Sequence, residues 1–201
     1  MHAYAYPLME DFYTIQGEGF NTGKAAYFLR LGGCDVGCVW CDVKDSWEAE
    51  KHPVVSVEEI VARVLKSGAD KVVVTGGEPA MYDLLPLTNA LHNEKIECFI
   101  ETSGAYPLTG NWEWICVSPK KFKAPLPEIL KRADELKIIV FNISDFDWAK
   151  TNAAFTRPNC ILFLQPEYSV LEKIMPSIIN HVKSNTHWRI SLQTHKYIGI
   201  P

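Results

Sequence analysis

The chain has 201 residues, of which 47% are hydrophobic and 22% are charged, a composition typical of globular proteins. Its formal net charge of -4 gives no electrostatic reason to expect direct binding to nucleic acid. Residues 1–10 lack a basic and apolar leader, and no apolar run reaches membrane-spanning length. We therefore expect one cytoplasmic domain over residues 1–201, with no membrane partner.

The predicted elements begin after a polar, glycine-punctuated opening at residues 10–19. Residues 25–31 form the first expected strand, which Gly32 and Gly33 end. Ser56 and Glu59 make a capping box that opens a helix, and Gly68 ends it. A short apolar strand is then expected at residues 71–75, of the kind that is buried in a parallel sheet.

Strands and helices continue to alternate to the end of the chain. We expect Pro176 to kink or split the last helix. The expected helices are 83–93, 127–134, 149–155 and 170–183, and the strands are 96–101, 114–117, 136–140, 160–164 and 188–192. This order predicts an α/β fold with a parallel sheet, either a (β/α) barrel or an open doubly wound sheet. A full eight-unit barrel usually needs about 250 residues, so a partial (β/α) barrel fits better.

Polar residues cluster just after five of the strands, at the edge where α/β folds place ligand sites. Turn chemistry alone would explain some of these clusters. Their residues are 75–79, 101–104, 118–120, 165–167 and 193–196. All five would lie on the same rim as a loop that carries three cysteines after the first strand.

The cysteine loop has the spacing C-x3-C-x2-C at Cys34, Cys38 and Cys41. Thiolates suit iron–sulfur clusters, zinc or Cu(I), and a structural zinc site normally has four protein ligands. A four-iron cluster held by three thiolates has one iron open to another ligand. A zinc-stabilised binding protein, or buried thiols without metal, are the alternatives. The other cysteines, which lie in apolar runs, are expected to be buried small hydrophobic side chains without disulfides: Cys98, Cys116 and Cys160.

An open iron could chelate the amino and carboxylate groups of S-adenosylmethionine (SAM) and cleave it reductively to a 5′-deoxyadenosyl radical. Gly76 and Gly77 could offer backbone groups at close range, and Glu78 a carboxylate for the ammonium. Ser118 and Lys120 could reach ribose hydroxyls or a carboxylate. For Gly76 and Gly77, a simple strand-to-helix turn is an equally good explanation.

Several motifs together resemble a known family. The cysteine spacing, with Trp40 before the last cysteine, and the GGEP stretch at 76–79 are similar to the radical SAM superfamily. Residues 16–19 (QGEG), Arg30, 75–79, 101–104, 118–120, 165–166 and 193–196 (QTHK) resemble, in order, the 7-carboxy-7-deazaguanine synthase family.

The resemblance implies conversion of 6-carboxy-5,6,7,8-tetrahydropterin to 7-carboxy-7-deazaguanine with loss of ammonia, on the route to queuosine. It implies that Cys34, Cys38 and Cys41 bind a [4Fe–4S] cluster. SAM would be bound by Trp40, Gly76, Gly77, Glu78, Ser118, Pro119, Lys120, Gln165, Pro166, Glu167 and Tyr168. The pterin would be bound by Ile15, Gln16, Gly17, Arg30, Thr75 and Pro201, with Glu18 and His195 as the catalytic pair. A homodimer and a reductant such as flavodoxin are also implied.

The residue chemistry agrees with the implied substrate. A guanidinium such as Arg30 can bind a pterin carboxylate through two hydrogen bonds, and the N–H groups of the pyrimidone edge need acceptors. Arg30 could instead be a surface charge at a strand edge, and His195 a structural hydrogen-bonding residue.

One position departs from the family pattern. Members carry Thr two residues after the last cysteine, where its hydroxyl helps to bind Mg²⁺, whereas this chain has Val43. Valine cannot ligate a hard cation, so we expect Mg²⁺ to be held through substrate and water, with help from Asp42 or Asp45, or to be needed only weakly. A radical SAM activase that acts on a partner protein is a further alternative, although residues 193–201 favour a closed small-molecule pocket.

Overall fold

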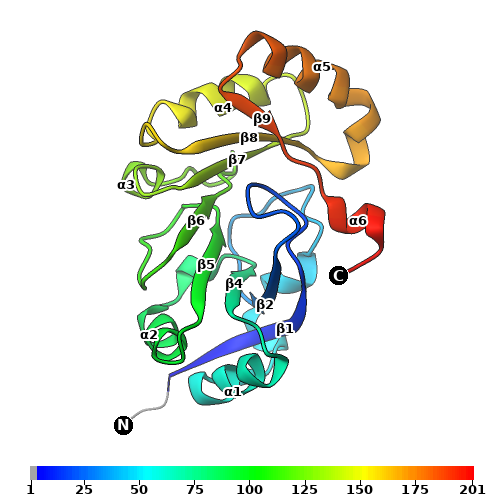
Figure 1. The fold of residues 1–201 in the computed structure, drawn as a ribbon. Coiled ribbons are helices and arrows are strands. Elements are labelled where there is room, and N and C mark those ends of the chain that lie inside the picture. The colour runs from blue at the N-terminus through cyan, green and yellow to red at the C-terminus, as the bar shows by residue number, and fades with distance from the viewer. Residues whose placement is uncertain (1–3) are drawn as a thin grey trace.

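Nine strands form one mixed sheet in the computed structural model, which describes residues 4–201 (Figure 1). The strand order is β3-β1-β2-β4-β5-β6-β7-β8-β9. Every pairing from β2 to β9 is parallel, while β1 runs antiparallel to both β2 and β3. The strands are β1 Ala5–Ile15, β2 Ala25–Leu31, β3 Val54–Ser56, β4 Lys71–Gly76, β5 Glu97–Thr102, β6 Trp114–Val117, β7 Glu135–Val140, β8 Ile161–Pro166 and β9 Trp188–Ile190. Within the described residues β3 and β9 are the two edge strands, and each pairs on one side only. The sheet is therefore open, and the predicted partial barrel is confirmed.

The first five helices of the described residues lie on the outer side of the curved sheet, and the last helix follows the final strand (Figure 1). The helices are α1 Val57–Ser67, α2 Leu85–Asn93, α3 Pro127–Leu130, α4 Asp145–Ala153, α5 Leu171–Ser184 and α6 Thr194–Ile198. Short 3₁₀ turns span Lys44–Trp47, Ala49–Lys51, Pro79–Met81 and Tyr168–Val170. No helix in residues 4–201 has both the length and the apolar character that crossing a membrane requires.

The limits of α1 follow from its sequence as predicted. The Ser56 side chain accepts a hydrogen bond from the Glu59 backbone N–H at 3.2 Å, so one unpaired N–H of the first turn is satisfied. Gly68 ends the helix in the left-handed region at φ 74°, where a side chain would be strained. The buried face of α1 includes Ile60 and Val64, which belong to the main core.

The alternation of side chains along the strands gives the sheet two different faces. The outer face carries fully buried apolar residues that pack under the helices, such as Leu29, Val74, Ile100 and Leu136. A smaller inner cluster of Ala26, Val73 and Phe99 packs with Phe28 and Trp114 inside the curve. Because the side-chain period of a strand is two, polar residues two positions beyond this inner cluster also face inward.

Strand register aligns these inward residues into one wall. Arg30 on β2 pairs with Thr75 on β4, and Glu101 on β5 pairs with Cys116 on β6. On the next strands Lys137 lies two residues after Glu135, which pairs with Cys116. The carboxyl ends of the parallel strands therefore present a polar interior above an apolar base.

Three details of the sequence prediction were wrong or incomplete. Residues 10–15, expected as a polar opening, belong to the long strand β1, whose charges are paired: Glu10 with Arg30, and Asp11 with Tyr27 and Arg63. The short elements β3 and α6 were not predicted. Helix α5 runs without a break through Pro176, which therefore does not split it.

Two helix limits also moved. Helix α3 ends at Leu130, earlier than expected, and α4 begins at Asp145 rather than at residue 149. The Asp145 carboxylate fixes the earlier start of α4, because it accepts hydrogen bonds from the Phe141 and Asn142 backbone N–H groups, each at 2.8 Å. Composition alone did not reveal that local contact.

The cysteines outside the loop behave mostly as predicted. Cys98 is fully buried and Cys116 is 4% exposed, as expected of small hydrophobic side chains in strands. Cys160 is only partly buried and lies just before β8, so its predicted burial is not complete. All six cysteines are free thiols.

Candidate active site

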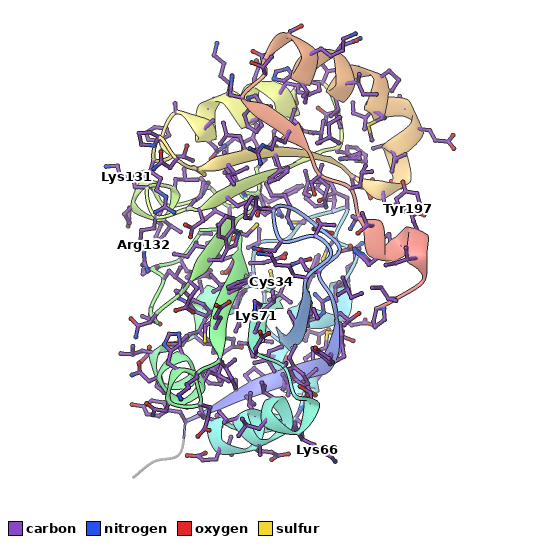
Figure 2. The ribbon with its side chains drawn as sticks, in the orientation of Figure 1. Cys34, Lys66, Lys71, Lys131, Arg132 and Tyr197 are labelled. Carbon is purple, nitrogen blue, oxygen red and sulfur yellow. The ribbon has the colours of Figure 1, made fainter. Side chains whose placement is uncertain are left out.

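One pocket of about 270 Å³ lies inside the curve of the sheet, near the carboxyl ends of the parallel strands. Figure 2 shows Cys34 in the centre of the molecule and Tyr197 of α6 at its outer edge. Every predicted site residue except Pro119 lines this pocket. Pro119 is buried, and its carbonyl accepts a hydrogen bond from the Trp148 indole at 3.4 Å.

The cysteine loop is shaped by backbone conformation. Gly33 and Gly37 have φ values of 101° and 73°, which residues with side chains rarely adopt. The Cys34 N–H donates to the Trp47 carbonyl at 3.1 Å, and the Cys41 N–H donates to the Cys38 carbonyl at 3.1 Å. The three thiols thereby face one pocket from a single short loop.

The number and softness of the ligands in the cysteine loop fit a cluster better than a structural zinc ion. Among residues 4–201, a set of three His, Cys, Asp or Glu ligand atoms within 4.8 Å of one another occurs only at His92, Cys98 and Glu113, outside this pocket. A structural zinc site normally has four protein ligands, whereas this loop offers three thiols. The soft, three-thiol set therefore fits an iron–sulfur cluster.

The two glycines of the GGEP stretch let β4 pass directly against the cysteine loop. A Cβ on Gly76 would overlap the Leu31 carbonyl, and one on Gly77 would overlap the Gly33 carbonyl and Cys34. The Gly77 and Glu78 N–H groups donate to the Leu31 and Gly33 carbonyls, each at 2.9 Å. These glycines therefore join two loops that both line the pocket, which is more than a simple strand-to-helix turn requires.

The Glu78 carboxylate is already occupied by the protein. It is 1% exposed and accepts hydrogen bonds from the Ala80 N–H at 3.0 Å, the Thr102 hydroxyl at 2.5 Å, and both the N–H and hydroxyl of Ser103. A carboxylate has about four acceptor positions, and all are used here. A ligand ammonium would therefore compete with these protein donors for the Glu78 carboxylate, which lines the pocket, and the predicted contact stays a prediction.

Trp40, Ser118 and Lys120 form one wall near the cysteines. The Lys120 ammonium donates to the Ser118 carbonyl and hydroxyl, each at 2.6 Å, and lies 5.7 Å from the centre of the Trp40 ring. Burial lowers the pKa of Lys120, while the nearby Cys38 thiol raises it. This wall offers a cation, a hydroxyl and an aromatic face to a bound molecule.

Arg30 on β2 also lines the pocket, next to Thr75 on β4. Its Nε donates to the Glu10 carboxylate at 2.6 Å, and its side chain is 19% exposed. A guanidinium has five N–H donors in a planar fork, so the remaining donors can bind an anion. Arg30 is therefore a pocket residue and not only a surface charge.

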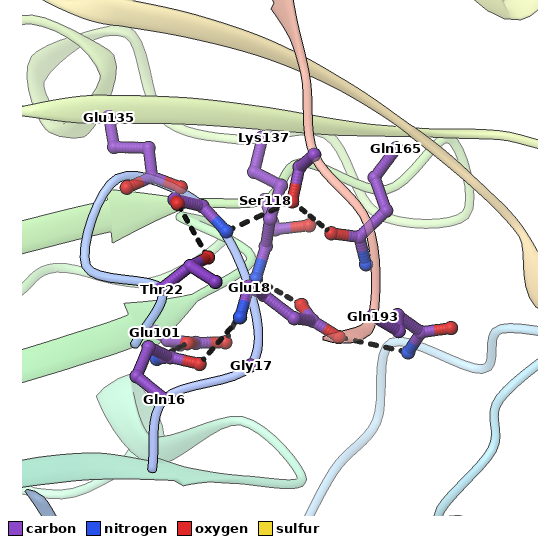
Figure 3. Close-up of polar contacts among 12 residues, drawn as sticks. Gln16, Gly17, Glu18, Thr22, Glu101, Ser118, Glu135, Lys137, Gln165 and Gln193 are labelled. Atoms are coloured by element: carbon purple, nitrogen blue, oxygen red, sulfur yellow. Dashed lines mark hydrogen bonds and ion pairs between the residues drawn. The ribbon is translucent and has the colours of Figure 1, made fainter. Parts of the chain in front are cut away.

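A buried charged network crosses the floor of the pocket (Figure 3). Lys137 Nζ lies 2.5 Å from Glu18 Oε2 and 3.2 Å from Glu101 Oε2, and the lysine side chain is 3% exposed. Gln16 donates to Glu101 at 2.8 Å, and Gln193 donates to Glu18 at 2.9 Å.

The network controls the charge of its members. Burial alone would raise the pKa of Glu18, but the Lys137 ammonium and hydrogen bonds from Lys137, Gln193 and Gln165 lower it to about 2. Burial would lower the pKa of Lys137, yet Glu101 and Glu18 raise it well above its usual value. Glu18 is therefore an anion and Lys137 a cation throughout the physiological pH range.

Helix α6 closes the pocket from the C-terminal side. The Gly17 carbonyl accepts hydrogen bonds from the Thr194 N–H at 2.8 Å and the Thr194 hydroxyl at 2.9 Å. A Cβ on Gly17 would overlap the His195 imidazole, so only glycine lets this helix approach. His195 and Pro201 thereby reach the pocket although they lie at the end of the chain.

Val43 stands where the family pattern has the threonine that helps to bind Mg²⁺. It lines the pocket together with Asp42. Lys196 Nζ lies 3.8 Å from the Asp42 carboxylate. Asp45 does not line the pocket, and its carbonyl contacts the His52 ring at 2.8 Å. Of the two carboxylates considered for Mg²⁺, only Asp42 is therefore placed to take part.

The predicted site did not include several polar residues of the pocket, among them Lys137, Gln193 and the Glu101 side chain. A signal for Lys137 was present, because it is the one charged residue in the apolar run 136–140. A lysine inside a buried parallel strand is rare unless it has a partner. Gln193 and Glu101 stood in polar stretches already noted, but spacing could not show which side chains pair.

Comparisons with known proteins agree with this geometry. The profile of the Radical SAM superfamily matches residues 29–144. The chain is 55% identical to the 7-carboxy-7-deazaguanine synthase of Flavobacterium psychrophilum, over 97% of this chain and 92% of that protein. It is 45% identical to the synthase of the same name from Synechocystis, over 98% and 94% respectively. The crystal structure of QueE from Escherichia coli superposes with a TM-score of 0.85 at 35% identity, covering 95% of each chain.

Proposed function

Because this chain belongs to the 7-carboxy-7-deazaguanine synthase family of radical SAM enzymes, we propose specific roles for the residues of its pocket. The family reaction converts 6-carboxy-5,6,7,8-tetrahydropterin to 7-carboxy-7-deazaguanine with loss of ammonia, within queuosine biosynthesis. The observation that carries this function is the shared pocket: three loop cysteines and the Arg30–Glu18–His195 side face the same cavity.

The cysteine side of the pocket would hold the cofactors. Cys34, Cys38 and Cys41 would bind a [4Fe–4S] cluster, which together with SAM supplies the radical that starts the reaction. Lys120 and Ser118 present donors for the carboxylate or ribose of SAM, and Trp40 presents an aromatic face. The backbone at Gly76 and Gly77 approaches this space closely, whereas the Glu78 carboxylate supports the loop from behind. Residues 165–168 line the cavity beside them.

The opposite side would bind the pterin. Arg30 would bind its carboxylate, because its Nη donors are directed to no described carboxylate while Glu10 takes Nε. Glu18 and the Gln16–Gly17 backbone would accept hydrogen bonds from the N–H groups of the pyrimidone edge. His195 and the C-terminal Pro201 would close the site.

Mg²⁺ remains a proposal for this chain. We propose that Asp42 assists binding of the cation, since Val43 offers no oxygen and Asp42 is the carboxylate near it that lines the pocket. Lys196 lies close enough to Asp42 to compete for the same oxygen. A hard cation at this position would need further oxygens from substrate and water.

Other features of the system rest on the family likeness alone. We propose a homodimer, a one-electron reductant such as flavodoxin, and one domain spanning residues 1–201. A reducing cytoplasm suits a chain whose six cysteines are all free thiols.

The function is tested by anaerobic incubation of the reconstituted protein with reductant, SAM and the carboxypterin. We expect 7-carboxy-7-deazaguanine to be detected by mass, with SAM recovered rather than consumed. The Cys38→Ala variant should fold, lose its iron and make no product, whereas Cys98→Ala should keep both iron and activity. Product formation by Cys38→Ala at the wild-type rate would contradict the cluster assignment.

A further inference from the structure

Lys137 is a buried cation on the inner face of β7. Its neighbours Leu136 and Ile138 are fully buried on the outer face of the sheet, so Lys137 points into the pocket. With a side chain 3% exposed, it has lost almost all of its contact with bulk water. Such a lysine persists only where anionic partners offset the lost hydration.

Its partners come from two other parts of the chain. Glu18 lies in the loop after β1, and Glu101 lies on β5. Gln16 fixes Glu101 and Gln193 fixes Glu18, so both carboxylates are held from both sides (Figure 3). Two carboxylates share one ammonium, which leaves one net negative charge at the pocket floor.

We propose that Lys137 is a positioning residue that holds Glu18 ionised and in one orientation, so that Glu18 accepts hydrogen bonds from an N–H-rich heterocycle edge. This inference rests on the proposed function, which supplies a substrate with such an edge. Lys137 itself would act through Glu18, and the heterocycle edge would meet the Glu18 carboxylate.

The acceptor count of Glu18 supports this role. Its Oε1 receives Gln193, its Oε2 receives Lys137, and Gln165 also donates to the carboxylate, which together fill three of about four acceptor positions. Glu18 lines the pocket, so the remaining position can face a bound molecule. Glu78 shows the contrast: its acceptor positions are filled by protein donors.

Without the ammonium, Glu18 would change its hydrogen-bonding character. Burial raises its pKa, and the lysine charge is the main influence that lowers it. A protonated carboxyl donates through one oxygen and would meet an N–H group with the wrong polarity. The titratable or charged groups that face Glu18 from neighbouring elements are Glu101, Cys116, Glu135, Lys137 and His195.

The test is the pH dependence of pterin binding to cluster-loaded protein with SAM and without reductant. For wild type, Glu18 stays ionised above its pKa of about 2, so this group should cause no loss of affinity between about pH 6 and about pH 8. In Lys137→Met the pKa of Glu18 rises. We expect affinity to fall as the pH is lowered, approaching tenfold per pH unit below the new pKa.

Lys71→Met is the matched control. Lys71 also contacts two carboxylates, Asp70 at 2.8 Å and Glu97 at 3.5 Å, but it lies at the start of β4 and does not line the pocket. We expect its binding profile to match wild type. Lys137→Arg keeps the charge, so it should bind the pterin more weakly because of its larger head, with no new pH dependence.

A double variant separates positioning of Glu18 from simple neutralisation of Glu101. Lys137→Met/Glu101→Gln removes one charge of each sign, and we expect it to keep the new pH dependence of Lys137→Met. Recovery of the wild-type profile in the double variant would overturn the inference, as would a flat profile in Lys137→Met or a pH-dependent one in Lys137→Arg. If wild type makes no product, the proposed function fails instead, and this comparison does not depend on turnover.

Discussion

At the scale of single residues, the pocket divides its carboxylates between two tasks. Glu78 gives its oxygens to Ala80, Thr102 and Ser103, and so ties the loop after β4 to the end of β5. Glu18 keeps acceptor capacity toward the cavity while Lys137 holds its charge. The same residue type therefore supports the scaffold in one place and faces the cavity in the other.

The structural task of Glu78 predicts a stability effect. Glu78→Gln would turn one acceptor oxygen into an NH₂ group that faces the donors of Thr102 or Ser103. We expect a loss of about 1–3 kcal/mol in unfolding free energy for the metal-free protein. Urea denaturation measures it, with Glu94→Gln as a control at an exposed carboxylate after α2. Equal stability of the two variants would show that the Glu78 network contributes nothing.

The motifs predicted well which side chains reach the pocket. They predicted less well which groups those side chains contact there. Arg30, Thr75 and His195 were all expected in the site from their motifs, and all line the cavity. The protein donors around the Glu78 carboxylate were not predicted, because a motif gives proximity but not the hydrogen-bond partners that compete for an oxygen. Lys137 was overlooked for the same reason: its partners are distant in sequence.

At the scale of elements, the site is positioned by strand ends. Polar stretches after β4, β5, β6 and β8 were predicted to share one rim, and residues from each of them line the pocket. The prediction succeeds because parallel strands place their carboxyl ends together. The strand β1 itself was not predicted, because its adjacent charged residues Glu10 and Asp11 hide the alternating pattern. In the fold these two carboxylates are stabilised by Arg30 of β2 and Arg63 of α1.

Helix α6 could not be predicted, because five residues carry too little pattern to define a helix. Its first residue is held by the carbonyl of Gly17, which accepts hydrogen bonds from the N–H and the hydroxyl of Thr194. The helix brings His195 into the pocket, where it packs against Gly17. The C-terminal side of the pocket thus depends on a contact between the two ends of the chain.

This contact predicts a separable effect on substrate binding. Thr194→Val removes the hydroxyl hydrogen bond at nearly constant volume, at a cost of about 1 kcal/mol. We expect the KM for the pterin to rise about fivefold while the iron content stays at the wild-type level. Thr151→Val is the control, because it removes a similar hydroxyl–carbonyl bond on α4, outside the pocket. An unchanged KM in Thr194→Val would show that α6 does not depend on this bond.

At the scale of the whole molecule, the open barrel brings the cysteine loop and the charged residues around Glu18 to one cavity. The chain length predicted a partial barrel. The sheet is indeed open, with β3 and β9 as its two edge strands. The thiol loop reaches the cavity after β2, whereas the Glu18 loop enters between β1 and β2 and meets β5, β7 and residue 193. A cofactor on one side and a substrate on the other would lie within one enclosed space.

The central claim is that three thiolates leave one iron open for SAM. The most direct measurement is the electron paramagnetic resonance spectrum of the anaerobically reconstituted and reduced protein, recorded with and without SAM. We predict a cluster signal whose g-values shift when SAM is added, because the added ligand changes the coordination of one iron. A cluster signal that SAM leaves unaltered, or a protein that binds zinc and gives no signal, would contradict the account.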